Sequence, residues 1–281
     1  MPTRSDPAII TSTSNPRVME ARKLGQRKYR QAAELFLVEG LQILHMALDG
    51  GGVPHEVFYC QEQFVGLEAA ALLERFQQHG AALLRVSMRV METLSEREEP
   101  RGIVATFCLA QPPLASLKLT GHELVVVLDR LQDPGNLGTL IRTADAVGAA
   151  AVILIEPCVD PFDPKTVRGS MGSLFNVPVI STKDVTDLFA WLKSRGIRPV
   201  GADPHLGEAW GEGLWRGGVA LVLGNEARGL SDDVAAQVNA SAKLPLVGRA
   251  ESLNVAVAGG VLMYAWLRAN LPAQAERPVQ E

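Results

Sequence analysis

Residues 128–148 read LDRLQDPGNLGTLIRTADAVG, and this segment predicts a strand, a polar loop and a helix in direct succession. An aliphatic run ends at Asp129, and the apolar residues that follow the loop recur at helical spacing, namely Leu137, Ile141 and Ala144. Asn136 is a typical N-cap residue, and Gly148 is a typical helix end. A second apolar run, 151–155, follows at once. The segment therefore predicts a strand–helix–strand unit with polar residues where the first strand ends, the usual ligand site of open α/β sheets.

The rest of the C-terminal part continues this alternation of short apolar strands and helices. Strands are predicted at 123–128, 151–155, 177–179, 199–202, 219–223 and 242–244. Such alternation predicts an α/β fold with a mostly parallel sheet and helices on both faces. The apolar run 253–267 predicts a buried helix, and it is too short to span a bilayer, so we expect no membrane association.

The N-terminal part, residues 1–110, predicts a separate and smaller α/β domain. Strands are expected at 36–40, 57–60 and 102–109, and helices at 41–48 and 67–79. The polar, proline-bearing stretch 111–121 is the predicted linker to a second domain at 122–270. The tail, 271–281, is expected to be flexible.

Composition limits the classes of function that the chain can have. Its 281 residues are 47% hydrophobic and 21% charged, with a net charge of −4, so any contact with a polyanion must use a local basic surface. Three separated cysteines, Cys60, Cys108 and Cys158, form no metal-binding spacing, and we expect no metal. Unpaired cysteines and the lack of a signal-peptide core predict a cytoplasmic location.

One basic stretch near the N-terminus is a candidate for such a surface. It contains a single acidic residue, Glu20, among six cations: Arg17, Arg22, Lys23, Arg27, Lys28 and Arg30. The stretch is helix-like, and its charges favour contact with RNA phosphates. A solvated helix face is the alternative, because charge runs commonly have no other role.

Two further segments place glycine or polar residues where a strand ends or a helix begins. The first reads LGNEARGL at 223–230, and Gly224 lets a ligand approach bare backbone there. The second reads LPLVGRAESLN at 244–254, with Ser252 as the expected N-cap of the last helix. Together with 128–148 they suit a nucleotide-like cofactor held mainly by main chain. The sequence contains neither a dinucleotide fingerprint nor a P-loop, and a Ser–His–Asp hydrolase is not indicated.

These three segments, in this order, resemble the three motifs of the SpoU (TrmH-like) branch of the SPOUT RNA methyltransferases. The resemblance covers residues 123–270. The first domain opens with T-S-x-x-N-P-x-V at 11–18 and contains F-L-V-E-G at 36–40, so it resembles the substrate-binding domain that precedes the catalytic domain in many members.

The resemblance implies S-adenosylmethionine as methyl donor, a ribose 2′-hydroxyl of ribosomal RNA as acceptor, a C-terminal trefoil knot and a homodimer. The implied catalytic residues are Arg142, Asn136, Glu226, Ser252 and Asn254. The implied cofactor contacts, largely through backbone, fall on Gly224, Leu244 and Leu253. A loop at 162–172, with Arg168, Ser170 and Gly172, matches a family loop that shapes the pocket.

Simpler roles compete with each of these assignments. Arg142 either polarises the hydroxyl and stabilises its developing charge, or acts as a base despite the strong basicity of guanidine, or only forms a salt bridge to Asp145 or Glu226. Asn136 and Ser252 could be helix caps alone, and Gly224 a tight turn alone. For the whole chain, the alternatives are a tRNA 2′-O-methyltransferase, a base N-methyltransferase, and a non-catalytic RNA-binding or ribosome-assembly protein.

Overall fold

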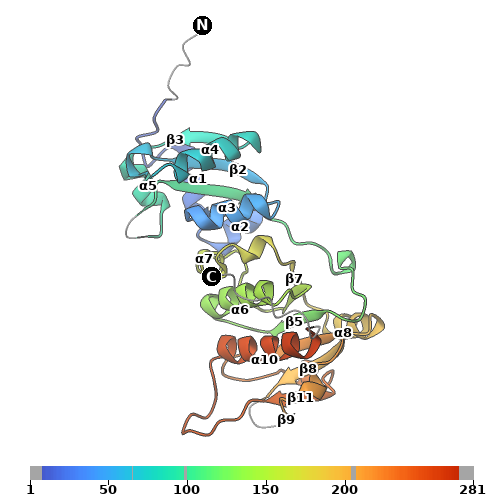
Figure 1. Ribbon diagram of the computed structural model, residues 1–281. Helices are drawn as coiled ribbons and strands as arrows, with labels where there is room; N and C mark the ends of the chain where they lie inside the picture. The colour runs from blue at the N-terminus through green and yellow to red at the C-terminus, as the bar shows by residue number, and fades with distance from the viewer. Residues whose placement is uncertain (1–7, 65, 98–99, 204–206, 272–281) are drawn as a thin grey trace, which may run out of the picture. The chain divides into compact units, whose positions relative to one another are not determined.

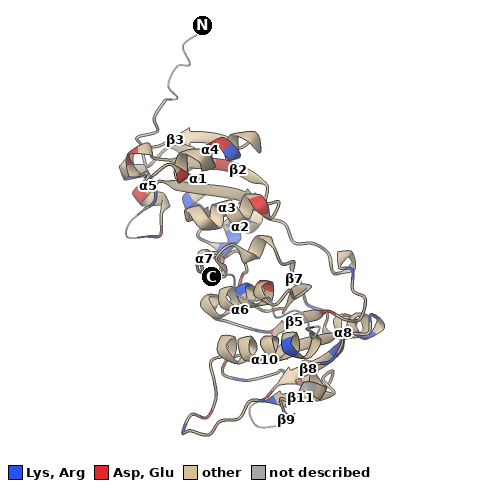
Figure 2. Ribbon diagram, viewed as in Figure 1, with Lys and Arg blue, Asp and Glu red and all other residues tan. Residues whose placement is uncertain are grey.

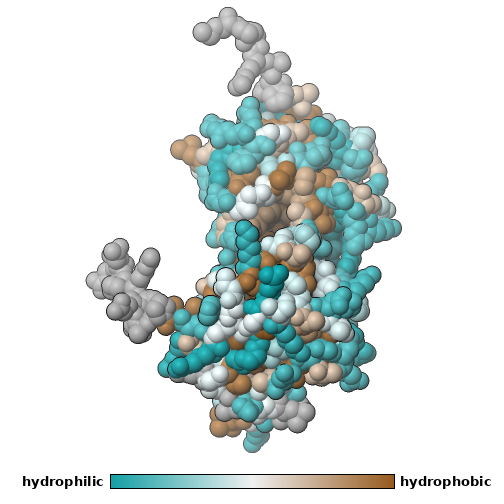
Figure 3. Space-filling view, turned by 90° about the vertical axis from the view of Figure 1, so that its right-hand side faces the viewer, coloured by the Kyte–Doolittle hydropathy of each residue, from teal (hydrophilic) through white to brown (hydrophobic). Residues whose placement is uncertain are grey.

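The chain passes between two structural units three times in the computed structural model, which describes residues 8–64, 66–97, 100–203 and 207–271. The first unit comprises Met1–Ala110 together with Asp160–Asn176, and the second comprises Gln111–Val159 and Val177–Glu281. The predicted flexible tail lies outside the described residues except for Leu271. On the face drawn in Figure 3, hydrophilic residues surround scattered hydrophobic ones in each unit, as is normal for a protein surface.

A parallel sheet forms the centre of the second unit (Figure 1). Its described strands lie in the order β7-β6-β5-β10-β8-β11-β9, and every neighbouring pair is parallel. The strand bounds are β5 Leu124–Asp129, β6 Ala151–Ile155, β7 Val179–Thr182, β8 Arg198–Ala202, β9 Glu208–Ala209, β10 Val219–Leu223 and β11 Ala240–Lys243. The predicted α/β class and parallel sheet are confirmed, and parallel strands end at a common edge.

Helices cover both faces of this sheet, because alternate residues of each buried strand point to opposite sides. Val125 and Val127 of β5 join the core on the face covered by α8 (Val185–Ser194). The other face carries α6 (Pro134–Ala146) and α10 (Val255–Asn270), which pack against each other. The short α9 (Asp232–Ala235) and η4 (Glu212–Leu214) complete the unit. No helix in the described residues is long and apolar enough to cross a membrane.

Close packing of α10 depends on one glycine. A Cβ atom at Gly259 would lie 2.6 Å from Leu140 of α6 and 2.7 Å from Leu223 of β10. The predicted linker also packs on this unit, since Leu117 and Leu119 are buried in its core and η2 (Leu114–Ser116) precedes them. Apolar residues in that stretch thus attach it to the sheet.

The first unit has a four-stranded mixed sheet in the order β1-β4-β2-β3. Only β2 and β3 are parallel, and β4 is antiparallel to both of its neighbours. Its elements are α1 Pro16–Lys23, α2 Arg27–Ala33, β1 Leu35–Glu39, α3 Leu41–Asp49, β2 Pro54–Tyr59, η1 Gln61–Gln63, α4 Glu68–Gln78, β3 Ala82–Arg85, α5 Met88–Leu94 and β4 Ile103–Cys108. The sequence did not predict β3 or α5, because each is short and weakly patterned.

The segment Asp160–Asn176 belongs to the first unit because its aromatic side chains enter that unit's core. The Phe162 ring lies 4.8 Å from the Phe36 ring, and the Phe175 ring lies 5.3 Å from the Phe107 ring, measured between centroids. The segment forms α7 (Pro164–Ser170) and η3 (Ser173–Phe175). Between them Gly172 has φ +98°, and a Cβ there would lie 2.6 Å from Met46. The loop predicted at 162–172 is therefore a packed part of the first unit.

The basic stretch near the N-terminus forms two helices rather than one. Residues 24–26 separate α1 from α2, and the structure buries Arg30, which is 1% exposed. Its Nη2 and Nε donate to one Asp160 oxygen at 2.7 and 3.1 Å, and its Nη1 donates to the Leu24 carbonyl at 2.7 Å. The assignment of Arg30 to an RNA-binding surface is wrong, because its charge is buried and neutralised within the first unit.

Replacing Arg30 tests this correction. Arg30→Met leaves Asp160 as a mostly buried carboxylate without its partner, which costs about 3 kcal/mol or more. Calorimetry is therefore expected to show the first unit unfolding about 10 °C lower. Arg22→Met, at an exposed position of the same stretch, is the matched control and should change stability by about 0.5 kcal/mol at most. Equal unfolding temperatures for the two variants would contradict the buried ion pair.

Candidate functional site

The Glu226 carboxylate joins two loops at the edge of the parallel sheet where the strands end. Its Oε1 accepts hydrogen bonds from the Asp133 amide at 3.2 Å and from Asn136 Nδ2 at 3.1 Å. Its Oε2 accepts from the Gln132 amide at 3.3 Å. One acidic side chain after β10 thus holds the loop that follows β5.

Asn136 connects this pair to the third segment. Its Oδ1 accepts from Asn254 Nδ2 at 3.0 Å, while its own Nδ2 donates to Glu226. The Asn254 Oδ1 in turn accepts from the amides of Ala256 and Val257 at the start of α10. A continuous chain of hydrogen bonds therefore runs from Glu226 through Asn136 to Asn254, and it fixes which way each amide group points.

Helices α6 and α10 are capped by residues other than those expected. Asp133, not Asn136, caps α6, since its Oδ1 accepts from the Asn136 amide at 2.7 Å. Asn254, not Ser252, caps α10. Aspartate and asparagine cap as well as serine does, so residue type alone could not separate these neighbours. The consequence is that the Asn136 side chain serves the contact between segments, and that Ser252 lies exposed before the helix begins.

Arg142 is exposed on α6, two helical turns after the loop. Among the ion pairs found in the described part of the chain, none joins Arg142 to Glu226. Its guanidinium is therefore available to a ligand. A guanidinium stays protonated at neutral pH and presents five N–H donors, which suits an oxygen that gains negative charge.

The three residues expected to contact a cofactor lie at loops near the same sheet edge. Gly224 follows β10, Leu244 follows β11, and Leu253 lies 41% exposed beside the cap of α10. A Cβ atom at Gly224 would lie 2.3 Å from the Gly229 backbone, so the close return of its own loop already requires glycine there. The tight turn is thus sufficient to explain why residue 224 is a glycine.

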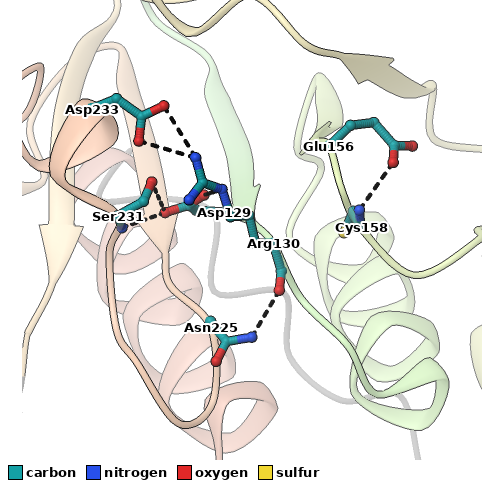
Figure 4. A network of polar contacts seen from close by, with 7 residues as sticks. All are labelled: Asp129, Arg130, Glu156, Cys158, Asn225, Ser231 and Asp233. Carbon is teal, nitrogen blue, oxygen red and sulfur yellow. Dashed lines mark hydrogen bonds and ion pairs between the residues drawn. The ribbon is translucent and has the colours of Figure 1, made fainter.

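Cys158 lies buried near this edge, and its backbone amide donates to Glu156 at 3.0 Å (Figure 4). Burial raises the pKa of its thiol to about 12, and the charges of Glu156 and Glu226 add to the effect. A thiol with this pKa stays protonated at neutral pH, so Cys158 is not suited to act as a nucleophile.

Sequence reasoning missed a second group of polar residues at this edge. Figure 4 shows Asp129 and Arg130, at the end of β5, facing Asn225, Ser231 and Asp233. The signal available in the sequence was an acidic residue, Asp129, at the end of an aliphatic run. The structure buries this residue, which is 1% exposed.

The remaining basic residues form an exposed group on α1 and α2, and Figure 2 shows the basic positions on α2 in blue. Arg22, Lys23, Arg27 and Lys28 are exposed. The ammonium groups of Lys23 and Lys28 lie 5.7 and 4.7 Å from the centre of the Tyr29 ring. Arg17 is half exposed and pairs with Glu56 at 3.0 Å. We call Arg22, Lys23, Arg27 and Lys28 the basic cluster.

Two family descriptions match the chain. The model of the SpoU rRNA Methylase family matches residues 123–264, and that of the MRM3-like substrate binding domain matches residues 15–105. Among relatives, an uncharacterized tRNA/rRNA methyltransferase of Synechocystis is 35% identical over 94% of each chain. The 23S rRNA (guanosine(2553)-2′-O)-methyltransferase RlmP of Bacillus subtilis is 32% identical over 91% of this chain and 97% of its own.

Solved structures of similar proteins cover both units. The AdoMet-bound rRNA methyltransferase of Sinorhizobium meliloti has a TM-score of 0.85 and 33% identity, over 94% of this chain and 99% of its own. The SpoU methyltransferase AviRb of Streptomyces viridochromogenes, in complex with AdoMet, has a TM-score of 0.82 and 29% identity, over 90% and 97%.

Proposed function

The chain belongs to the SpoU rRNA methylase family, and from this premise we propose that it transfers the methyl group of S-adenosylmethionine to a ribose 2′-hydroxyl of ribosomal RNA. The observation that carries the proposal is the hydrogen-bonded chain Glu226–Asn136–Asn254, which brings all three motif segments to one sheet edge. Similarity to RlmP, which is named for the same reaction, supports the ribose as acceptor.

The residues at this edge fit S-adenosylmethionine as cofactor. Gly224 follows β10, Leu244 follows β11 and Leu253 precedes the cap of α10, so their main-chain groups are donors and acceptors near one sheet edge. We propose that these residues hold the cofactor through their backbone. When bound, the sulfonium supplies an activated methyl group, so the protein must align and activate only the acceptor.

Arg142 is the proposed electrostatic catalyst. Its guanidinium donates a hydrogen bond to the 2′-oxygen and stabilises the negative charge that develops there. With the donor bound, the ribose oxygen would form its bond to the methyl carbon as the carbon–sulfur bond breaks, S-adenosylhomocysteine would leave, and the hydroxyl proton would pass to solvent. Asn136, held by Glu226, and Asn254, held by Asn136, form the polar wall of the proposed site, and the exposed Ser252 hydroxyl is the proposed contact to the ribose.

Nucleoside analysis tests the proposal. Purified protein, ribosomal RNA and methyl-labelled S-adenosylmethionine are incubated, and the RNA is digested to nucleosides. The label is expected in a 2′-O-methylnucleoside. Label in a base-methylated nucleoside would favour a base methyltransferase, label only in transfer RNA would favour that substrate, and no label in either RNA would favour a non-catalytic RNA-binding protein.

Arg142→Ala is the matched variant for this assay. Loss of the only proposed oxyanion donor should lower the methyl-transfer rate about 100-fold or more, while the affinity for S-adenosylmethionine stays within about twofold. Circular dichroism checks that the variant is folded. Substantial turnover by a folded Arg142→Ala protein would remove the assigned role.

We further propose that the basic cluster binds RNA phosphates. Changing Arg22, Lys23, Arg27 and Lys28 together to Gln removes up to four phosphate contacts, and each contact contributes about 0.7 to 0.9 to the slope of log affinity against log salt. The slope is therefore expected to fall by up to about 3 to 4 in a binding titration. A Lys193→Gln, Arg195→Gln protein, changed on exposed residues of the second unit, is the control. An unchanged slope in the fourfold variant would exclude this surface.

A second copy of the chain is the proposed partner of α10. Val257 and Tyr264 on that helix are 54% and 52% exposed, and Val261 lies on the same stripe at helical spacing. Burying this stripe against its equivalent would remove apolar surface from water. Sedimentation velocity should show a dimer for the unaltered chain and a monomer for the double variant Val257→Asp, Tyr264→Asp. A monomeric unaltered chain at micromolar concentration would contradict the proposal.

The trefoil knot and the cytoplasmic location stay predictions.

A further inference from the structure

The carboxylate of Asp129 ties the end of β5 to the segment that follows β10. Its Oδ2 accepts two hydrogen bonds at 2.7 Å, one from the Ser231 amide and one from the Ser231 hydroxyl (Figure 4). Asp129 is 1% exposed, and a buried carboxylate is stable only when such partners compensate for lost hydration. Ser231 is therefore fixed relative to β5.

Arg130, the next residue, makes two further contacts with the same segment. Its Nη2 lies 3.2 Å from both oxygens of Asp233, and its carbonyl accepts from Asn225 Nδ2 at 2.9 Å. Its Nε lies 3.6 Å from the second oxygen of Asp129. Arg130 has φ +55°, a left-handed conformation that is uncommon for a residue other than glycine and persists only where contacts enforce it.

The pKa of the Asp233 carboxyl lies below its ordinary value, because the Ser231 side chain and the Arg130 guanidinium favour its charged form. Of these two, Arg130 is the partner at hydrogen-bond distance from both Asp233 oxygens, since the Ser231 hydroxyl donates to Asp129. The contact between Arg130 and Asp233 is therefore an ion pair at neutral pH.

The turn 225–229, which lies between these contacts, is closed by its own hydrogen bonds. Asn225 and Gly229 exchange two backbone hydrogen bonds of 2.9 Å, and Asn225 Oδ1 accepts from the amides of Ala227 and Arg228. Glu226 lies inside this turn. Anchors at Asn225 on one side and at Ser231 and Asp233 on the other therefore fix the position from which Glu226 reaches Asn136.

We propose that Asp129 and Arg130 are positioning residues for the methyl transfer, acting through Glu226: they fasten the turn 225–229 to β5 and so set the Glu226–Asn136 contact. The proposal rests on the proposed function for its catalytic consequence. Main-chain pairing of β5 with β10 already joins the two strands, so the fold itself does not require charged side chains here. What the charged contacts add is a single position for the turn, and a displacement of about 1 Å at a reacting group can cost about 100-fold in rate.

A double-mutant cycle with Glu226 tests the catalytic consequence. Arg130→Gly keeps the left-handed backbone without strain and removes only the side chain. Its single-turnover rate is expected to fall about tenfold in the unaltered background but less than about twofold when Glu226→Gln is already present, since both changes disrupt one contact. Asp129→Asn should lower the rate by a similar factor in each background. Arg130→Lys should be faster than Arg130→Gly, because it keeps the positive charge. The control Arg195→Gly, at an exposed residue of the same unit, should leave the rate unchanged.

Amide hydrogen exchange tests the fastening without any activity. The amides of Gln132 and Asp133 donate to Glu226, so their exchange rates report whether its carboxylate is in place. Exchange at both amides is expected to rise about fivefold in Arg130→Gly and in Glu226→Ala, but not in Arg195→Gly.

The two measurements separate the proposal from the function on which it rests. Unchanged exchange at Gln132 and Asp133 in Arg130→Gly overturns the proposal, whatever the activity. Faster exchange with rate losses that multiply in the double variant also overturns it, because Arg130 then acts on the rate by another route. If the unaltered protein methylates no RNA, the proposed function fails, and the exchange experiment alone decides whether Asp129 and Arg130 hold Glu226.

Discussion

The carboxylate of Glu226 is the contact on which the rest of the site depends. It accepts hydrogen bonds from the amides of Gln132 and Asp133 and from the side chain of Asn136, and through Asn136 it is linked to Asn254. Residues 90 to 118 positions apart in the sequence are thereby held together. A charged acceptor makes stronger hydrogen bonds than a neutral one, so one acidic side chain can hold the three loops in contact with one another.

The fold places these loops within reach of that carboxylate. All neighbouring strands of the sheet are parallel, so the loops after β5, β10 and β11 leave from one edge. Helices on both faces bury the strands, and ligands of such sheets usually bind at the edge where the strands end. The same edge carries Asp129 and Arg130, whose charges hold the turn that contains Glu226. The parallel sheet and the contacts of Asp129 and Arg130 therefore position the same few residues.

The sequence predicted the parts of the fold that depend on local pattern. Buried strands such as Ala151–Ile155 and Val219–Leu223 appear as uninterrupted apolar runs, and their bounds were predicted correctly. It could not predict features set by distant residues. Arg30 is buried because Asp160, 130 positions away, neutralises it, and 160–176 joins the first unit because Phe162 and Phe175 find aromatic partners there. The predicted cap residues were wrong for a different reason. Asp133 and Asn136 are both good caps, and only the observed hydrogen bonds distinguish them.

A crystal structure with S-adenosylhomocysteine, the product left after methyl transfer, tests the central claim most directly. We expect the nucleoside to bind against the main chain of Gly224, Leu244 and Leu253, with the hydrogen-bonded chain Glu226–Asn136–Asn254 intact beside it. A product molecule bound elsewhere in the chain, or bound here with Glu226 turned away from Asn136, would contradict the account.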